Sequence, residues 1–151
     1  MYTGPAQISM AEKGFKGRAR AEGERDSLTR TRILIVEDEP NIVESLSYIL
    51  RRADFDVDVA ANGNDALERL RRTDFSAMIL DVMMPGMNGF DVLRAVRADR
   101  SLSGLPVIVL TAKGQSRDRQ TATEIGASAF ITKPFSNAEI VERVRDLAQV
   151  R

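Results

Sequence analysis

The sequence predicts an α/β fold with a parallel sheet, and two observations lead to that prediction. From Thr31 onward, five short apolar runs alternate with five segments whose apolar residues recur at helical spacing. Three of the runs, at residues 33–36, 77–80 and 107–110, are apolar throughout, as strands are when helices cover both faces of a parallel sheet. With 43% hydrophobic and 29% charged residues among 151, the chain can bury the core of one such domain.

The first two strands, at residues 33–36 and 57–60, differ in pattern. The second alternates apolar and acidic residues through Val57, Asp58 and Val59, which favours a place at the edge of the sheet. An amphipathic helix follows each strand. The apolar residues of the first helix are Ile42, Val43, Leu46, Ile49 and Leu50, and those of the second are Ala66, Leu67 and Leu70.

The third strand, at residues 77–80, leads into the turn sequence PGMNG at residues 85–89. A third helix follows, with Phe90, Val92, Leu93 and Val96 on its apolar face.

The fourth strand, at residues 107–110, precedes the weakest helix of the prediction. In residues 115–125 only Ala122 and Ile125 supply an apolar face, so we expect this helix to be loosely held. The fifth strand, at residues 129–131, is followed by a last amphipathic helix. Its apolar residues are Ile140, Val141, Val144, Leu147 and Ala148.

The composition excludes several classes of function. The chain has no cysteine and no histidine, which removes disulfides, thiol and imidazole chemistry, and zinc sites built on those ligands. Lys plus Arg and Asp plus Glu both total 22, so no net positive field attracts nucleic acid or an acidic membrane surface, and we expect neither as a direct partner. No apolar run approaches the roughly 20 residues that span a bilayer, and no signal peptide is recognisable, so we expect a cytoplasmic protein.

The first thirty residues differ from the rest. They contain four glycines and few large apolar side chains, namely Tyr2, Ile8, Phe15 and Leu28. We therefore expect residues 1–30 to be a flexible N-terminal extension and residues 31–151 to be the folded domain.

Polar side chains follow four of the five predicted strands. Glu37, Asp38 and Glu39 follow the first strand, Asp81 the third, Thr111 the fourth, and Thr132 and Lys133 the fifth. In open α/β sheets, ligands bind beyond the carboxyl ends of the strands, so these residues are the candidates for a site.

The type of residue indicates the chemistry. Carboxylates gathered at one edge repel each other unless a hard cation lies between them, and Mg²⁺ fits a site with few protein carboxylates. Lys133 could neutralise an anion beside the metal, and the Thr111 hydroxyl could donate a hydrogen bond to it. This combination indicates phosphoryl transfer. Because no glycine-rich nucleotide loop is present, a carboxylate is the better candidate for the phosphoryl acceptor.

Four motifs in this order resemble the receiver domain of two-component response regulators. They are ILIVEDE at residues 33–39, LDVMMPGMNG at 80–89, LTA at 110–112 and TKPF at 132–135. The resemblance covers residues 31–150. It implies a flavodoxin-like (βα)5 doubly wound sheet with strand order 2-1-3-4-5.

The resemblance also implies a role for each site residue. Asp81 would be the phosphoacceptor, and Thr111 and Lys133 would hold the phosphoryl oxygens. Mg²⁺ would be bound by Asp38, Asp81 and the backbone carbonyl of Met83, with Glu37 acting through water. Thr111 and Phe130 would form the conformational switch, and the Lys133–Pro134 peptide bond would be cis. Glu37 departs from the family pattern, because many receivers have aspartate at that position.

The function implied is a phosphorylation-dependent signalling switch rather than an independent enzyme. A histidine kinase or a histidine phosphotransfer protein would donate the phosphoryl group, and a downstream protein target would read the conformational change. A homodimer through the fourth helix, fifth strand and fifth helix is a further expectation, because these elements carry charges of both signs. The charged residues are Arg117, Asp118, Arg119, Glu124, Glu142, Arg143 and Asp146. The chain ends after the fifth helix without a recognisable output domain, as in a single-domain regulator or an excised receiver.

Simpler interpretations exist for the same residues. The acidic run could only start a helix, Asp81 could cap a turn, and Thr111 could cap the helix that follows it. Phe130 could be a core residue without a switching role. We expect the three methionines at residues 83, 84 and 87 to fill the loop beneath the site.

Two other functions compete with the switch. A Mg²⁺-dependent phosphohydrolase with an aspartyl nucleophile typically carries a second aspartate two residues on, where this chain has Met83. A phosphorylation-independent interaction module would not need the complete set of Asp38, Asp81, Thr111 and Lys133.

Overall fold

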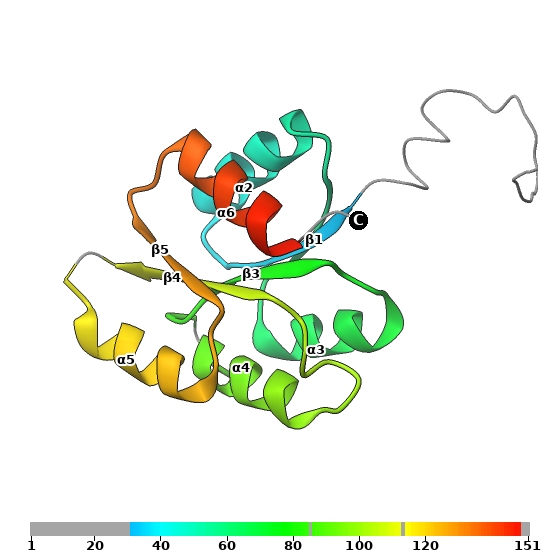
Figure 1. Ribbon diagram of the computed structural model, residues 1–151, viewed down its shortest axis with the longest axis vertical. Coiled ribbons are helices and arrows are strands. Elements are labelled where there is room, and N and C mark those ends of the chain that lie inside the picture. Colours follow the sequence, from blue (N-terminus) through cyan, green and yellow to red (C-terminus); the bar gives the residue numbers. More distant parts are fainter. Residues whose placement is uncertain (1–30, 85, 113, 149–151) are drawn as a thin grey trace, which may run out of the picture. The chain divides into compact units, whose positions relative to one another are not determined.

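The computed structural model describes residues 31–84, 86–112 and 114–148, and the element labels below are those of Figure 1. The strands are β1 (Arg32–Val36), β2 (Asp56–Ala60), β3 (Ala77–Asp81), β4 (Val107–Ala112) and β5 (Ala129–Lys133). The helices are α2 (Pro40–Arg52), α3 (Gly63–Arg72), α4 (Gly89–Ala98), α5 (Ser116–Ile125) and α6 (Asn137–Ala148). The alternation predicted from the sequence is confirmed. The extension expected at residues 1–30 lies outside the described residues.

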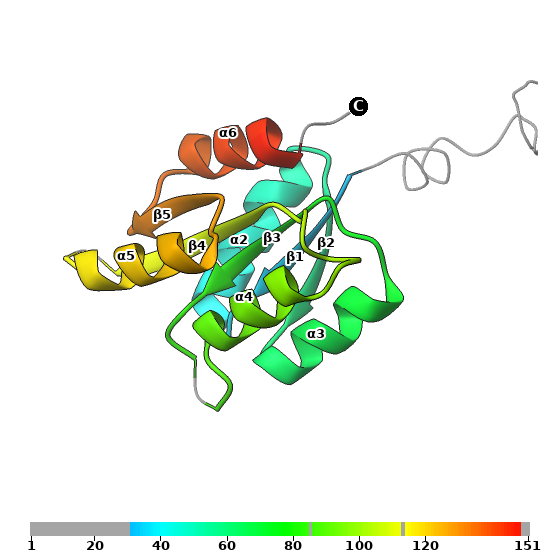
Figure 2. The same cartoon turned by 60° about the horizontal axis from the view of Figure 1, so that its bottom comes forward.

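The strands form one parallel sheet in the order β2-β1-β3-β4-β5, the order that the resemblance implied. As its alternating pattern predicts, β2 lies at the edge of the sheet, and its first four residues are only half-buried. Because all strands run the same way, their carboxyl ends lie at the same end of the sheet (Figure 2). Asp81 pairs there with Leu110, and Ala112 pairs with Lys133. The polar residues after the strands are thereby brought to the same edge.

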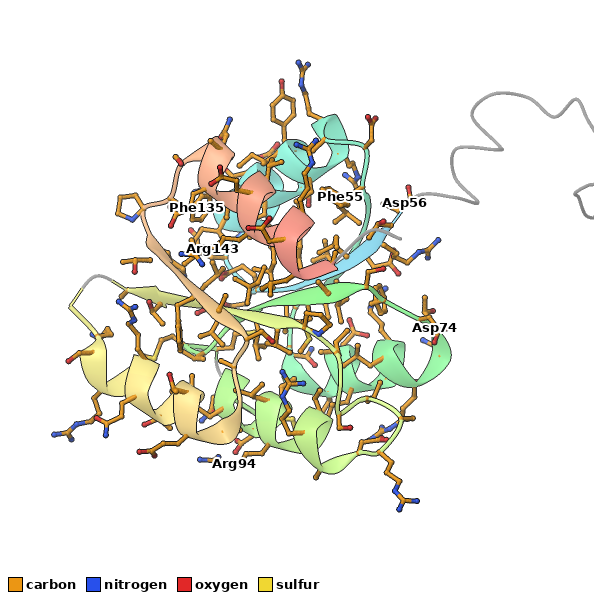
Figure 3. All side chains as sticks on the ribbon, viewed as in Figure 1. Phe55, Asp56, Asp74, Arg94, Phe135 and Arg143 are labelled. Carbon is orange, nitrogen blue, oxygen red and sulfur yellow. The ribbon has the colours of Figure 1, made fainter. Side chains whose placement is uncertain are left out.

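Helices cover both faces of the sheet (Figures 1 and 2). α2 and α6 pack on one face against Ile35 and Ile79, and α3, α4 and α5 pack on the other against Leu34 and Leu80. These four side chains are fully buried, and burying one contributes about 1.5–3 kcal/mol. Figure 3 shows Phe55 and Phe135 in the α2–α6 layer. The strands that carry the site residues are therefore held in place by packing on both faces.

Side-chain caps hold the starts of four helices, and at α6 the Ser136 hydroxyl accepts a hydrogen bond from the Glu139 N–H at 3.1 Å. Glu39, Asn62 and Asn88 are the N-caps of α2, α3 and α4, and each side chain accepts a hydrogen bond from the backbone N–H three residues on. α5 differs, because its N-cap residue Gln115 makes no side-chain capping bond and Ala122 is its fully buried residue. The weak apolar face predicted for this helix is confirmed.

The other end of α5 is held by Arg97, which lies near the end of α4. Its guanidinium donates hydrogen bonds to the carbonyl oxygens of Gly126 at 2.9 Å, Leu105 at 2.7 Å and Ser103 at 3.0 Å. Gly126 follows α5 with a φ of 124°, and a Cβ atom built there would lie 3.1 Å from Arg97 Nε. Arg97 thus ties the C-terminal end of α5 to α4 and to the segment before β4.

None of the described helices combines the length and apolar character that a membrane span requires.

Candidate phosphoryl-transfer and metal site

Four strand ends bring the predicted residues together. Asp81 is the last residue of β3, Thr111 lies near the end of β4, and Lys133 is the last residue of β5. Glu37 and Asp38 follow β1 directly, and the Glu37 amide donates a hydrogen bond to the Ala60 carbonyl at 3.1 Å, which continues the β1–β2 pairing. The loops after these strands start from fixed positions in the sheet.

Three carboxylates form the acidic part of the site. Glu37, Asp38 and Asp81 each offer one oxygen, and these atoms all lie within 4.8 Å of one another. Glu37 is 1% exposed and Asp81 is 3% exposed, whereas Asp38 is open to solvent. Two buried acids and one accessible acid therefore face a common point.

Lys133 supplies the opposing charge. Its Nζ lies 3.6 Å from Asp81 Oδ2 and 3.5 Å from Glu37 Oε1, and its side chain is 27% exposed. The peptide bond between Lys133 and Pro134 is cis, as the resemblance implied. One ammonium thus lies beside two buried carboxylates.

The environment of the site raises the pKa of Glu37 to about 7. Burial is the main cause, because it removes water from the charged form, and the neighbouring Asp81 carboxylate raises the pKa as well. The Glu39 amide, which donates to Glu37 Oε2 at 3.1 Å, and the Lys133 ammonium act in the opposite direction. At Glu37, burial and the Asp81 carboxylate therefore outweigh the Glu39 amide and the Lys133 ammonium in setting the pKa.

The oxygen set fits a hard divalent cation. Mg²⁺ takes oxygen ligands, requires few protein carboxylates and retains several waters. Asp38 and Asp81 could bind it directly, and the exposure of Asp38 leaves room for water and for phosphoryl oxygens.

Thr111 presents a buried hydroxyl near the end of β4, the strand that neighbours β3. Its Oγ1 has no hydrogen-bond partner among the described residues, although the residue is only 1% exposed. Buried polar atoms are usually satisfied, and this hydroxyl is therefore available to donate to an anion bound at the strand ends. The interpretation of Thr111 as a helix cap is wrong, because the N-cap of α5 is Gln115.

Met83 lies two residues after Asp81, in the loop after β3. Its backbone N–H donates to Asp81 Oδ1 at 3.0 Å, so Asp81 does shape the turn after its own strand. The Met83 side chain is 67% exposed, which corrects the expectation that it fills the loop, whereas Met84 is buried and Met87 is half-buried. The Met84 and Met87 side chains pack with the core instead.

Phe130 is half-buried in β5 and packs against the core beneath α3, α4 and α5. The Arg119 guanidinium of α5 lies over its ring, 5.2 Å from the centroid. The sequence predicts Arg119 only as a surface charge, because no local pattern shows which ring it covers. This pair links α5 to β5.

A family model for the response regulator receiver domain matches residues 33–145. The chain belongs to this family. Within it, the DNA-binding response regulator MtrA of Mycolicibacterium smegmatis is 44% identical over 116 residues, which cover 77% of this chain and 50% of that protein. The sensory transduction protein RegX3 of the same species is 38% identical over 115 residues, with 76% and 49% covered. The receiver chain thus spans about half the length of these curated relatives.

Solved receiver structures share the fold. The receiver domain of a signal transduction histidine kinase from Syntrophus aciditrophicus superposes with a TM-score of 0.74 at 35% identity, covering 79% of this chain and 90% of that one. The receiver domain of the sensor histidine kinase PA1611 from Pseudomonas aeruginosa gives 0.75 at 28% identity, covering 80% and 98%. That second structure is described with a magnesium ion coordinated in its active-site cleft.

Proposed function

We propose that this receiver domain is a phosphorylation-dependent switch that accepts a phosphoryl group on Asp81. The supporting observation is the setting of Asp81, a buried carboxylate at the end of a central strand with Lys133 Nζ 3.6 Å from one oxygen and two further acids beside it. A carboxylate in this position can act as a nucleophile while the charges around it offset those of the incoming group.

Mg²⁺ is the proposed cofactor, held by Asp38, Asp81 and the Met83 backbone carbonyl, with Glu37 acting through water. When bound, it would neutralise charge on the phosphoryl oxygens and on the acids. In the proposed transfer, an Asp81 oxygen forms the new bond to phosphorus as the bond to the donor's leaving group breaks. The Lys133 ammonium and the Thr111 hydroxyl then hold phosphoryl oxygens.

The proposed donor is a histidine kinase or a histidine phosphotransfer protein, and the proposed reader is a downstream protein. Thr111 and Phe130 form the proposed switch between them. Curated relatives are described as DNA-binding regulators, and the chain matches about half of their length, so the absence of a nucleic-acid partner stays a prediction. A homodimer through α5, β5 and α6 is part of the same proposal.

The experiment is labelling with acetyl phosphate, followed by intact-protein mass spectrometry with Mg²⁺ and with excess chelator. We expect one phosphoryl group on the wild type with Mg²⁺ and none on Asp81→Asn, because an amide is a poor nucleophile. Asp74→Asn is the matched control, since Asp74 is an exposed residue between α3 and β3 (Figure 3). Equal labelling of Asp81→Asn, or equal labelling in chelator, would contradict the proposal.

A further inference from the structure

The loop between β3 and α4 closes on itself at the site. It leaves the sheet at Val82 and returns at Gly89, whose N–H donates to the Val82 carbonyl at 3.4 Å. Met83, the residue whose amide holds Asp81 Oδ1, lies inside this closed loop. The place where the loop returns therefore bears on the geometry of Asp81.

Gly89 leaves no room for a side chain at the return point. A Cβ atom built on it would lie 2.5 Å from Val82 Cα and closer still to the Asp81 carbonyl oxygen. Both are backbone atoms, and ordinary contact begins at 3.4 Å, so a methyl group requires a displacement of about 1 Å. Gly89 does not have a positive φ, in contrast to Gly86 at 74°, so the requirement at Gly89 is one of space.

The elements on either side of Gly89 are closely packed. On the α4 side, Val92, Leu93 and Val96 are fully buried, which holds the helix against the sheet. On the α3 side, the Met87 side chain lies against Gly63, where a built Cβ atom would be 2.8 Å from Met87 Cγ. The built Cβ atom meets the backbone of Asp81 and Val82 directly, so a displacement there moves the backbone that leads to Met83.

We propose that Gly89 is a positioning residue for phosphoryl transfer: its close approach to β3 sets where Asp81 and the Met83 backbone lie relative to Asp38 and Lys133. This inference rests on the proposed function, because the Met83 carbonyl and the Asp81 carboxylate matter jointly only if they hold metal and phosphoryl groups. A misplacement of reacting groups by 1 Å can cost about a hundredfold in rate.

The test compares Gly89→Ala with Gly104→Ala, a control at a loop glycine with open space around its Cβ position and no positive φ. We expect Gly89→Ala to lower the rate of acetyl phosphate labelling at saturating Mg²⁺ by roughly 10- to 100-fold. Calorimetry with Mg²⁺ alone should show weaker binding, and the Met83 amide resonance should move in metal-free protein. Gly104→Ala should match the wild type in all three measurements.

The outcomes separate a positioning role from a structural one. A folded Gly89→Ala with wild-type labelling rate and Mg²⁺ affinity overturns the inference, even if its melting temperature is lower. If the variant is unfolded in buffer, the measurements are repeated in trimethylamine oxide, which favours the compact state. Failure to fold there as well assigns Gly89 a structural role and overturns the inference. A wild type that is not labelled on Asp81 contradicts the proposed function instead, while the Mg²⁺ affinity and amide measurements still test Gly89.

Discussion

Lys133 lies beside two buried acids, yet its own side chain is a quarter exposed. We predict that Lys133→Ala can still be phosphorylated but loses the conformational response. Without this ammonium, the phosphoryl group makes no charge-assisted contact with the end of β5. The melting temperature should change by less than about 5 °C, because the buried Glu37, whose pKa is already about 7, can hold a proton once the ammonium is removed.

Nuclear magnetic resonance with and without beryllium fluoride, a phosphoryl mimic, measures that response. Lys133→Arg is the matched variant, because it keeps the charge but replaces a compact ammonium with a planar group. A large loss of stability together with an intact response would show that Lys133 is structural.

Several individual residues of the site were predictable from the sequence. Asp38, Asp81, Thr111 and Lys133 each follow an apolar run, and a parallel sheet brings such residues to one edge. The burial of Glu37 was not predictable, because it depends on how the β1 loop packs. The pair of Arg119 with Phe130 and the space at Gly89 depend equally on contacts between distant residues.

The strands extend further than the apolar runs indicate. β3 includes Asp81, and β5 includes Thr132 and Lys133, because backbone pairing continues through polar residues that an apolar pattern does not detect. The helices were located correctly wherever the apolar spacing was strong. For α5 the spacing was weak, and the structure shows the physical counterpart in a helix with a single buried residue, Ala122.

α5 is the element that we expect to respond to phosphorylation. It begins five residues after Thr111 without a side-chain cap, and its Arg119 covers Phe130. Drawing the Thr111 hydroxyl toward a phosphoryl group should therefore shift amide resonances in residues 114–125 and at Phe130. Chemical-shift mapping with beryllium fluoride checks this, with Asp81→Asn as the control. Shifts confined to α2 and α3 would contradict this route.

For the whole molecule, we propose that residues 31–151 fold and function without residues 1–30. Residues 31–148 form a five-stranded sheet with helices on both faces, and the first thirty residues offer few apolar side chains for burial. Deleting residues 1–30 should leave the thermal transition and Asp81 labelling unchanged.

Light scattering on the deleted chain and on the full chain should give the same mass, that of the proposed homodimer, because α5, β5 and α6 are retained. A loss of several degrees on deletion would show that the first thirty residues stabilise the domain. A mass that stays monomeric in both chains would contradict the dimer alone.

The hydrogen bonds of Arg97 fix the C-terminal end of α5 and leave the other end less constrained. Because the C-terminal end is fastened at Gly126 while the Ser116 end has no side-chain cap, we expect a displacement of α5 to be a rotation about the fastened end. A ten-residue helix is about 15 Å long, so a tilt of roughly 10° carries the Ser116 end through about 2.6 Å. Under this prediction the displacement is largest near Thr111 and smallest near Arg97, and a small shift of the Thr111 hydroxyl would change the angle of the α5 surface.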